Sequence, residues 1–520
     1  MSSGEASSRD RMSQRRESSD TFASSTHYPE SVAEVIALVK QAALEGRQLY
    51  PVSTGLNWGY GDDRPPQPGC ELVRLSRMNR IRNEESISLR NPVAVIEPGV
   101  TQGQLHAFLV QRCPELSFNV TGSARDTSII GNSLDRGAGY LGSRCEDLFA
   151  LEVVLGSGQL IQTGFRRLGE ASPLAHVHPH GLGPMLDGLF FQGNFGIVTS
   201  ACFRLVPRRP VHVALSMRLL KPTLAAAFVD EVCCMKRDGL LPAAVHVGNR
   251  LRTHATLERG AAEYLSDVCG VLGSVLAEEV EAALRFAAPA EWSGFSAVQG
   301  NAGQVKASVS EIKQRLRGLA RVMVVDGRKL EAGYALLHRS RWSRAARVRA
   351  AAIASIRPLL GLSLGIPTDV AVQSMFHDVA NAAASDAFSE SNIGLIYVSP
   401  ALPSDGVAAM EIVSQMTRLA QEFGHSLYVT LNFESASGLV AVTNIVFDKS
   451  SRDATGRATL CAQALEALVR QRGLELYRSR SAGMDQVVSE NPAYWGVVRS
   501  LKLALDPAEV ISPGRYCSPT

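Results

Sequence analysis

The sequence predicts an α+β protein with two main folded regions behind a short tail. Three observations lead to this prediction. Strands, polar loops and helices alternate between residues 27 and 210, which is typical of an α+β region rather than a doubly wound parallel sheet. Longer helical patterns alternate with strands over residues 211–473, and this middle region lacks glycine-rich loops. The last residues, 474–520, return to the loop chemistry of the first region.

The composition is that of an ordinary globular protein, with 45% hydrophobic and 20% charged residues. The formal net charge of +3 is too small to indicate a nucleic-acid or membrane partner. No apolar run reaches the roughly 18 residues that a membrane span requires, and the N-terminus lacks the apolar core of a signal peptide. We therefore expect a cytoplasmic protein. Residues 1–26 carry too little apolar content to pack, so a disordered tail is expected there.

A helix and a strand open the first region. Ser31 is placed to cap a helix whose apolar residues recur at helical spacing until Gly46 ends it. Residues 48–53 follow as a strand. A second unit repeats this arrangement, with a strand over residues 93–96 and a helix that Thr101 caps.

The later elements belong to both regions. A hairpin is expected around Ser157, and a helix is expected over residues 458–472, where Gly473 ends it. The remaining predicted strands cover residues 196–206, 320–325, 393–398, 439–447 and 474–478. The mixture of helices and strands in each region supports the α+β assignment.

Two glycine-rich loops carry the chemistry of the first region. They are PVSTGLNWGYG at residues 51–61 and TGSARDTSIIGNSLDRGAGYLG at residues 121–142. Glycine lets main-chain N–H groups approach a phosphate or a flat ring closely, and the short polar side chains add hydrogen bonds. Two such loops indicate one dinucleotide held from two sides. Arg515, after a Pro-Gly pair, is placed to meet an anionic cofactor.

Three of these glycines, Gly137, Gly139 and Gly142, match the G-x-G-x-x-G spacing of nicotinamide-binding proteins. That fingerprint requires a strand before the first glycine and a helix after the last. Here residues 132–136 precede the first glycine, and the residues after the last read as a strand, a turn and a second strand. A Rossmann site is therefore rejected.

Three histidines at alternating positions could imitate a metal triad. They are His176, His178 and His180, but Pro179 interrupts any regular strand, and no carboxylate or cysteine joins them in the sequence pattern. We therefore predict no metal site. The G-x-S-x-G elbow of serine hydrolases does not occur either.

Five segments, in the same order along the chain, resemble the vanillyl-alcohol oxidase and 4-cresol dehydrogenase family of FAD-binding flavoproteins. They are PVSTGLNWGYG at 51–61, GNSLDRGAGY at 131–140, LDGLFFQGNFGIVT at 186–199, LYRSRSAGMDQ at 476–486 and DPAEVISPGR at 506–515. The resemblance implies a PCMH-type FAD-binding domain built from both ends of the chain, 27–210 and 474–520. A cap domain over the substrate, residues 211–473, is inserted between them.

The resemblance also implies the residues around FAD. They are Pro51, Ser53, Thr54, Gly55, Leu56, Asn57, Trp58, Gly59, Thr121, Gly122, Ser123, Ser128, Ile130, Gly131, Asn132, Arg136, Gly137, Gly139, Tyr140, Gly196, Ile197, Val198 and Arg515. Family members bind a phenol by its oxygen with two tyrosines and an arginine, and the matching positions are Tyr60, Tyr477 and Arg478.

Such a trio favours the phenolate, because charge-assisted hydrogen bonds to an oxyanion are strong away from water. The added electron density eases departure of a hydride from the benzylic carbon to flavin N5. The expected function is therefore FAD-dependent oxidation of a para-substituted phenol or related aromatic alcohol. From spacing alone, Tyr477 and Arg478 also fit an ordinary strand end, and Tyr60 fits a turn.

The sequence departs from the family at three places. Leu395 stands where several members attach a histidine covalently to FAD, so non-covalent FAD is expected. Arg144 and Cys145 fall where an acidic residue is common. A histidine pair of a later cap strand is replaced by Gly-Leu-Val-Ala at 438–441. The usual base is then missing; Glu434 is a speculative substitute and otherwise a solvated strand residue.

These departures leave other functions open. One alternative keeps FAD but takes a bulkier or non-phenolic substrate, and another is a flavin-fold binding protein without chemistry. The expected partner is a small aromatic substrate. The electron acceptor, oxygen or an electron-transfer protein, is open, and the family resemblance also allows a homodimer.

Overall fold

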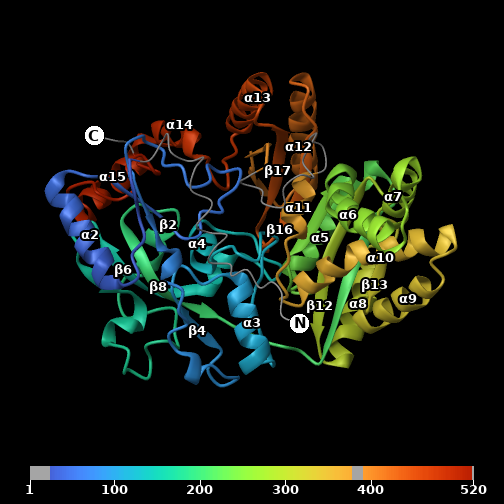
Figure 1. The fold of residues 1–520 in the computed structure, drawn as a ribbon, viewed down its shortest axis with the longest axis horizontal. Helices are drawn as coiled ribbons and strands as arrows, with labels where there is room; N and C mark the ends of the chain where they lie inside the picture. Colours follow the sequence, from blue (N-terminus) through green and yellow to red (C-terminus); the bar gives the residue numbers. More distant parts are fainter. Residues whose placement is uncertain (1–23, 377–390, 518–520) are drawn as a thin grey trace.

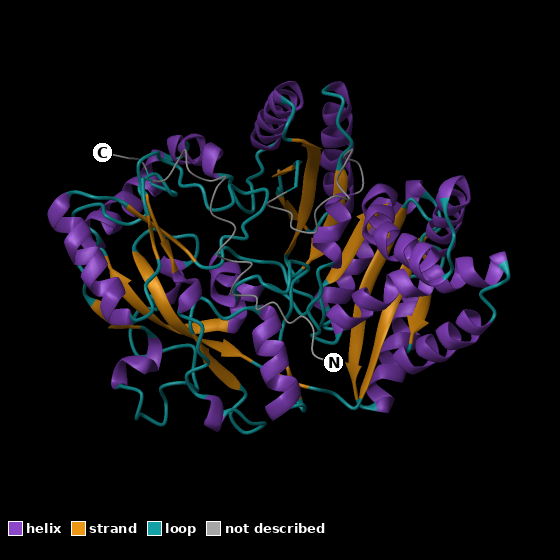
Figure 2. Ribbon diagram, in the orientation of Figure 1, coloured by secondary structure: helices purple, strands orange, loops and turns teal. Residues whose placement is uncertain are grey.

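The computed structural model describes residues 24–376 and 391–517, so most of the predicted tail lies outside the described residues. Two domains lie side by side, each built around its own β-sheet core (Figure 1, Figure 2). Both ends of the described chain contribute to the first domain, and the middle of the chain forms the cap domain. The structure is thus α+β. Within the described residues, no helix combines the length and apolarity needed to cross a membrane.

The first domain contains two main sheets. A parallel sheet has the order β1-β3-β2, and an antiparallel sheet has the order β4-β8-β6-β7. The strands are β1 (Thr26–His27), β2 (Leu49–Val52), β3 (Glu71–Arg74), β4 (Val93–Ile96), β6 (Leu148–Leu155), β7 (Leu160–Gln162) and β8 (Gly196–Arg204), with the short pair β5 (Leu116–Ser117) and β9 (Val206–Pro207) beside them. The helices are α2 (Val32–Glu45), α3 (Gln102–Arg112), α4 (Ile129–Leu134), α14 (Met484–Ser489) and α15 (Pro492–Leu505).

The cap domain is built on an antiparallel sheet of eight strands, in the order β13-β10-β12-β11-β16-β17-β14 with β15 beside β17. Its strands are β10 (Val211–Leu219), β11 (Val245–Asn249), β12 (Trp292–Gly300), β13 (Ala320–Val325), β14 (Ile393–Tyr397), β15 (Ala401–Pro403), β16 (Tyr428–Phe433) and β17 (Gly438–Asp448). Its helices are α5 (Ala225–Arg237), α6 (Arg250–Glu263), α7 (Gly273–Ala287), α8 (Ala302–Arg315), α9 (Gly327–Arg339), α10 (Arg344–Ser363), α11 (Val370–Gln373), α12 (Gly406–Glu422) and α13 (Arg452–Gln471).

The two faces of the cap sheet have different partners. Val245, Val247 and Leu431 point into the main apolar core, which α5, α8, α12 and α13 complete. Because side chains alternate along a strand, the intervening His246 and Asn432 occupy the opposite face. There the His246 ring lies 4.4 Å from the ring of Tyr140 in the second glycine-rich loop. This second face of the cap sheet therefore meets the first domain.

Local signals in the sequence predicted the first helices well. Ser31 and Thr101 cap α2 and α3 through their side chains, and Gly46 ends α2 in the left-handed conformation. The predicted strand over residues 474–478 is wrong, because only Leu476 pairs there, with Pro400. The Ala401 N–H donates to the Glu475 carbonyl at 2.9 Å and the Tyr477 N–H to the Ser399 carbonyl at 2.8 Å, so the pairing spans only residues 475–477.

The C-terminal segment is fastened to the first domain by a buried lysine. The Lys502 Nζ atom donates to the Asp506 carboxylate and to the Asn194 and Ile511 carbonyls, each at 2.6 Å. Ile511 in turn pairs with Leu49 at the start of β2. This arrangement holds the chain end, with Arg515, beside the first polar loop.

Candidate functional site

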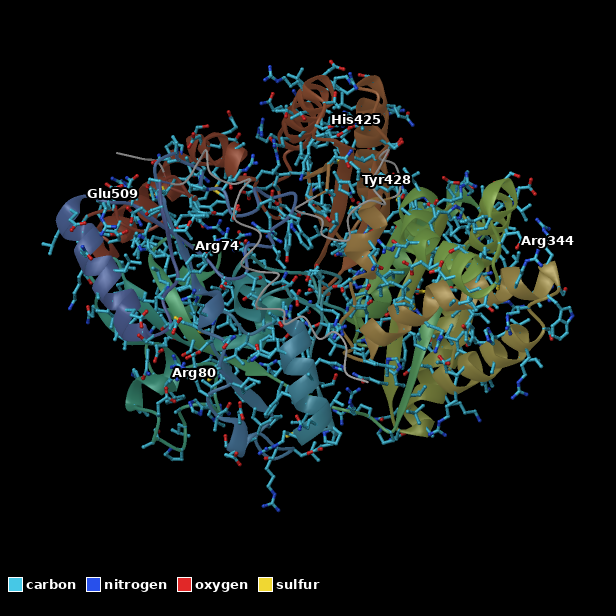
Figure 3. All side chains as sticks on the ribbon, viewed as in Figure 1. Arg74, Arg80, Arg344, His425, Tyr428 and Glu509 are labelled. Atoms are coloured by element: carbon cyan, nitrogen blue, oxygen red, sulfur yellow. The ribbon has the colours of Figure 1, made fainter. Side chains whose placement is uncertain are left out.

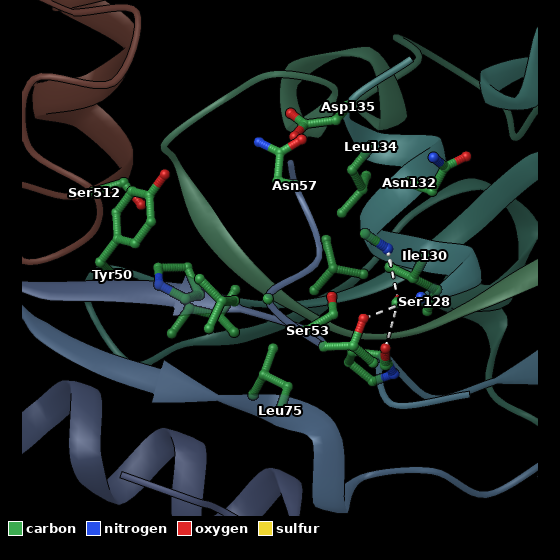
Figure 4. A pocket seen from close by; sticks show the side chains of 18 of the residues that line it. Tyr50, Ser53, Asn57, Leu75, Ser128, Ile130, Asn132, Leu134, Asp135 and Ser512 are labelled. Carbon is green, nitrogen blue, oxygen red and sulfur yellow. Dashed lines mark hydrogen bonds between the residues drawn. The ribbon is translucent and has the colours of Figure 1, made fainter. Parts of the chain in front are cut away.

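A cavity lies between the first polar loop, α4 and the start of β8 (Figure 4). Fifteen of the predicted site residues line it: Pro51, Ser53, Thr54, Gly55, Leu56, Asn57, Ser128, Ile130, Gly131, Asn132, Gly196, Ile197, Val198, Arg478 and Arg515. The structure therefore brings both polar loops, a strand and the C-terminal segment to one place, although they are far apart in the sequence.

The two polar loops touch each other at a glycine. A Cβ atom on Gly131 would lie 2.6 Å from the Ser53 Oγ atom, so only glycine permits this approach. The Ser128 N–H donates to Thr54 Oγ1 at 3.2 Å, and the Ser128 hydroxyl accepts from Gly131 N–H at 3.0 Å to cap α4. The buried Thr127 hydroxyl, which also lines the cavity, has no hydrogen-bond partner.

An ion pair fixes the far end of the first loop. Arg74 at the end of β3, labelled left of centre in Figure 3, binds the carboxylate of Asp63. Its guanidinium also lies close to Gly55, where a Cβ atom would approach Arg74 Nη1 to 2.8 Å. A tight polar cradle with an unused hydroxyl and an arginine at its edge fits a dinucleotide such as FAD.

Nine further residues predicted to contact FAD do not line this cavity: Trp58, Gly59, Thr121, Gly122, Ser123, Arg136, Gly137, Gly139 and Tyr140. Gly137 packs against the Asn132 amide, and Gly139 packs against the Asn119 amide. Gly59 faces the Tyr397 ring. Their contact with FAD stays a prediction.

Asp135 is the main residue that the sequence did not reveal. Its carboxylate binds both arginines of the cavity, Arg478 at 3.2 Å and Arg515 at closer range. Arg478 also donates to the Asn57 side chain. Burial alone would raise the pKa of Asp135, but the two guanidinium groups outweigh it and lower the pKa. Asp135 lies within the GNSLDRGAGY motif. The clue in the sequence is that two buried arginines require a carboxylate nearby as a counter-charge.

The structure brings Tyr60 and Arg478 together. The guanidinium carbon of Arg478 lies 4.1 Å from the centroid of the Tyr60 ring. The Tyr60 ring also stacks on the Tyr397 ring at 5.0 Å, and its hydroxyl forms a hydrogen bond of 3.2 Å with Ser399 Oγ. Burial raises the pKa of Tyr60 to about 12 in spite of Arg478. Tyr60 therefore stays protonated at neutral pH and can donate.

Tyr477, the third member of the predicted trio, has its hydroxyl engaged elsewhere. It donates to the Arg136 carbonyl, at the turn that follows α4. Burial, with the nearby Glu434 second, raises its pKa. Tyr477 is next to Arg478 in the chain, but the hydroxyls of Tyr477 and Tyr60 bind different partners.

The interpretation of Glu434 as a solvated strand residue is wrong. It follows the last residue of β16 and is half-buried, and its Oε1 atom has no hydrogen-bond partner. Burial, followed by repulsion from Glu146, raises the pKa of Glu434 to about 7. Glu434 follows β16 where the cap sheet meets the second glycine-rich loop, since a Cβ atom on Gly142 would lie 3.9 Å from the Glu434 carbonyl oxygen.

Two other expectations bear on the site. Leu395 lies on β14 in a small apolar cluster with Trp58 and Met375, so no histidine reaches FAD from that position. His176 contacts the Glu170 carboxylate at 2.6 Å, which corrects the expectation that no carboxylate joins the histidine run. Among the residues that the structure describes, no group of three metal-ligating side chains occurs.

Known proteins resemble this chain over most of its length. A family model described as an FAD binding domain matches residues 24–164. The 1'-carboxy-chondrochloren decarboxylase of Chondromyces crocatus is 32% identical over 511 residues, covering 94% of this chain and 89% of the relative. The 4-cresol dehydrogenase (hydroxylating) flavoprotein subunit of Pseudomonas putida is 22% identical over 488 residues, covering 93% of this chain and 86% of the relative.

The fold has a close counterpart among solved structures. The crystal structure of p-cresol methylhydroxylase with substrate bound matches with a TM-score of 0.79 at 21% identity. The match covers 98% of this chain and 93% of that chain, so it includes both domains.

Proposed function

Because the chain belongs to the PCMH-type family of FAD-binding flavoproteins, which includes 4-cresol dehydrogenase, we propose that it oxidises a para-substituted phenol at the benzylic carbon. FAD-dependent oxidoreductase chemistry is the property of the family, and the phenol is the proposed part. The contact of Arg478 with the Tyr60 ring, beside the cavity, is the observation that carries this proposal. We assign the FAD domain to residues 27–210 and 474–520, with the cap over residues 211–473.

Tyr60 and Arg478 would act on the phenol oxygen. A protonated Tyr60 donates a hydrogen bond, and the Arg478 guanidinium favours the anionic form of the phenol. Asp135 holds Arg478 in place by ion pairing, so the guanidinium needs little reorganisation when the substrate enters. Bound FAD supplies the acceptor for the hydride that leaves the benzylic carbon. With Leu395 at the family's attachment position, we propose that this FAD is not covalently bound.

The quinone methide left in the substrate must then be resolved. We propose that it loses CO₂ from a carboxylate on the carbon next to the benzylic carbon. The electron pair of the broken C–C bond forms a C=C double bond, and the ring returns to a phenolate. This step removes no proton and therefore needs no base. The missing histidine pair at 438–441 and the name of the 32%-identical relative, a decarboxylase, both support it.

A second outcome is favoured by Glu434. Its carboxyl, with a pKa of about 7, is suited to accept a proton from water that adds to the quinone methide. The product would then be a benzylic alcohol rather than an alkene. Product analysis separates the two outcomes directly.

The test uses the purified protein loaded with FAD and free of oxygen. We expect 3-(4-hydroxyphenyl)propanoate to bleach the visible flavin bands and to yield 4-vinylphenol and CO₂. An alcohol product would support the second outcome. If neither this acid nor 4-ethylphenol bleaches the flavin, the phenol proposal fails. Acid precipitation should release the flavin into the supernatant, and flavin kept in the pellet would contradict non-covalent binding.

A further inference from the structure

A second arginine with two tyrosines lies on the cap side of the same region. Arg252 is in the first turn of α6, and its Nη1 atom donates to the Ser374 hydroxyl at 2.8 Å. In the part of the chain that the structure describes, no carboxylate forms an ion pair with Arg252. Among the described residues, its remaining side-chain N–H donors and its charge have no partner.

Two tyrosine hydroxyls near Arg252 are also unused. Neither Tyr140 nor Tyr397 has a hydrogen bond from its hydroxyl to any described residue. Burial raises the pKa of both, that of Tyr140 to about 12, and the charge of Arg252 acts on both in the opposite direction. Both hydroxyls are protonated at neutral pH, so each can donate a hydrogen bond to an anion.

Short contacts place Tyr140 and Arg252 beside the same segment, residues 371–374. A Cβ atom on Gly122 would lie 3.5 Å from Ala371 Cβ and 3.9 Å from the Tyr140 hydroxyl oxygen. The Ser374 hydroxyl donates to the Ala371 carbonyl at 2.6 Å, and Arg252 donates to that same hydroxyl. Tyr140 and Arg252 thus approach the segment 371–374 from different elements.

Tyr397 connects this group to the proposed phenol site. Its ring stacks on the ring of Tyr60 at 5.0 Å with an interplanar angle of 8°. A phenol whose oxygen is held by Tyr60 and Arg478 would therefore have these unused donors close by, on the side of the cap domain. The His246 ring packs against Tyr140, but burial lowers the pKa of His246 to about 4, so it adds no charge at neutral pH.

We propose that Arg252, Tyr140 and Tyr397 form a subsite for the carboxylate of a 4-hydroxyphenyl carboxylic acid. A guanidinium binds a carboxylate with two parallel hydrogen bonds, and the two hydroxyls complete the donors that the oxygens accept. A half-buried arginine without a counter-charge is costly, and an anionic ligand removes that cost. This inference rests on the proposed function, since it names the second anchor of the same substrate.

The experiment compares two ligands that differ only in charge. They are 3-(4-hydroxyphenyl)propanoate and its neutral amide, tested on the FAD-loaded protein by calorimetric binding and by anaerobic flavin reduction. Charge-assisted hydrogen bonds contribute about 1.5–3 kcal/mol, or roughly 10- to 150-fold. In Arg252→Gln we expect the preference for the acid over the amide to fall at least tenfold, and Arg252→Lys to restore part of it.

Arg250→Gln is the matched control, because Arg250 is two residues earlier on α6, is exposed and pairs with Glu291. It should keep the preference for the acid. An Arg252→Gln protein that retains the full preference, or that loses acid and amide equally, overturns the subsite. If neither ligand reduces the wild-type flavin, the proposed oxidation fails, while the binding measurement still decides the subsite. Thermal unfolding of each variant checks that it is folded.

Discussion

The two arginine–tyrosine groups differ in what holds them. Arg478 beside Tyr60 is already bound by Asp135 and Asn57, whereas Arg252 near Tyr140 and Tyr397 donates to one serine hydroxyl. The first group is organised without a substrate, and the second has donors left over. The difference teaches that similar residues can have different roles. Among the described residues, Arg478 has a carboxylate partner and is preorganised for chemistry, whereas Arg252 has none and is suited to select a charged ligand.

The largest effect is expected for Arg478→Ala. Removing one preorganised donor from an oxyanion typically costs about 10²- to 10³-fold in rate. Flavin reduction by the acid, by its amide and by 4-ethylphenol should all slow by about this factor, measured in single-turnover experiments. Arg478→Lys should recover only part of the rate, because a lysine ammonium cannot form the bidentate hydrogen bonds of a guanidinium. If Arg252→Gln slows flavin reduction equally for all three phenols, the proposed difference between the two arginine–tyrosine groups is wrong.

Asp135→Asn tests whether the first group contributes to folding. Removing one partner of a buried ion pair leaves the other charge uncompensated, which typically costs about 3 kcal/mol. The free energy of unfolding in urea should fall by about that amount, since two arginines lose their shared carboxylate. Arg252→Gln removes no ion pair and should lose less than about 1 kcal/mol. Similar losses in both variants would contradict the comparison.

Glu434→Gln tests how the free energy of unfolding depends on pH. The pKa of Glu434 is raised from 4.5 to about 7, so the folded protein binds this proton more tightly than the unfolded chain. Its stabilising contribution is present below pH 4.5 and is lost as the pH rises to 7. At pH 8 the variant should be more stable than the wild type, by about 3 kcal/mol, and at pH 4 the two should be alike. A stability difference that does not change between pH 4 and pH 8 would refute the raised pKa.

The smallest effects belong to the two unused hydroxyls. A hydroxyl that donates to a carboxylate contributes at least about 1.5 kcal/mol, or roughly tenfold in binding. Tyr140→Phe and Tyr397→Phe should each weaken calorimetric binding of the acid by about that factor. Binding of the amide should change less, because an amide is the weaker acceptor. If calorimetric binding of the acid is unchanged in both variants, Arg252 binds the carboxylate without these two hydroxyls.

Local signals were readable from the sequence, and distant partners were not. Ser31 and Thr101 were predicted as caps because a cap and its helix are adjacent in the chain. At 474–478 the structure has one bridge, between Leu476 and Pro400, in place of the predicted strand, and this distant partner could not be read from the local pattern. The Asp135 bridge joins side chains more than 300 positions apart, and Arg252 belongs to no motif. Family motifs supplied Tyr60 and Arg478, while the partners that organise them required coordinates.

The lysine anchor of the chain end has a consequence for biosynthesis. Lys502 secures the segment that pairs Ile511 with Leu49, and this segment carries Arg515 to the cavity. During translation, the front half of the cradle is made long before its closing residues leave the ribosome. A nascent chain therefore cannot complete this cavity until residues 502–515 have emerged from the ribosome.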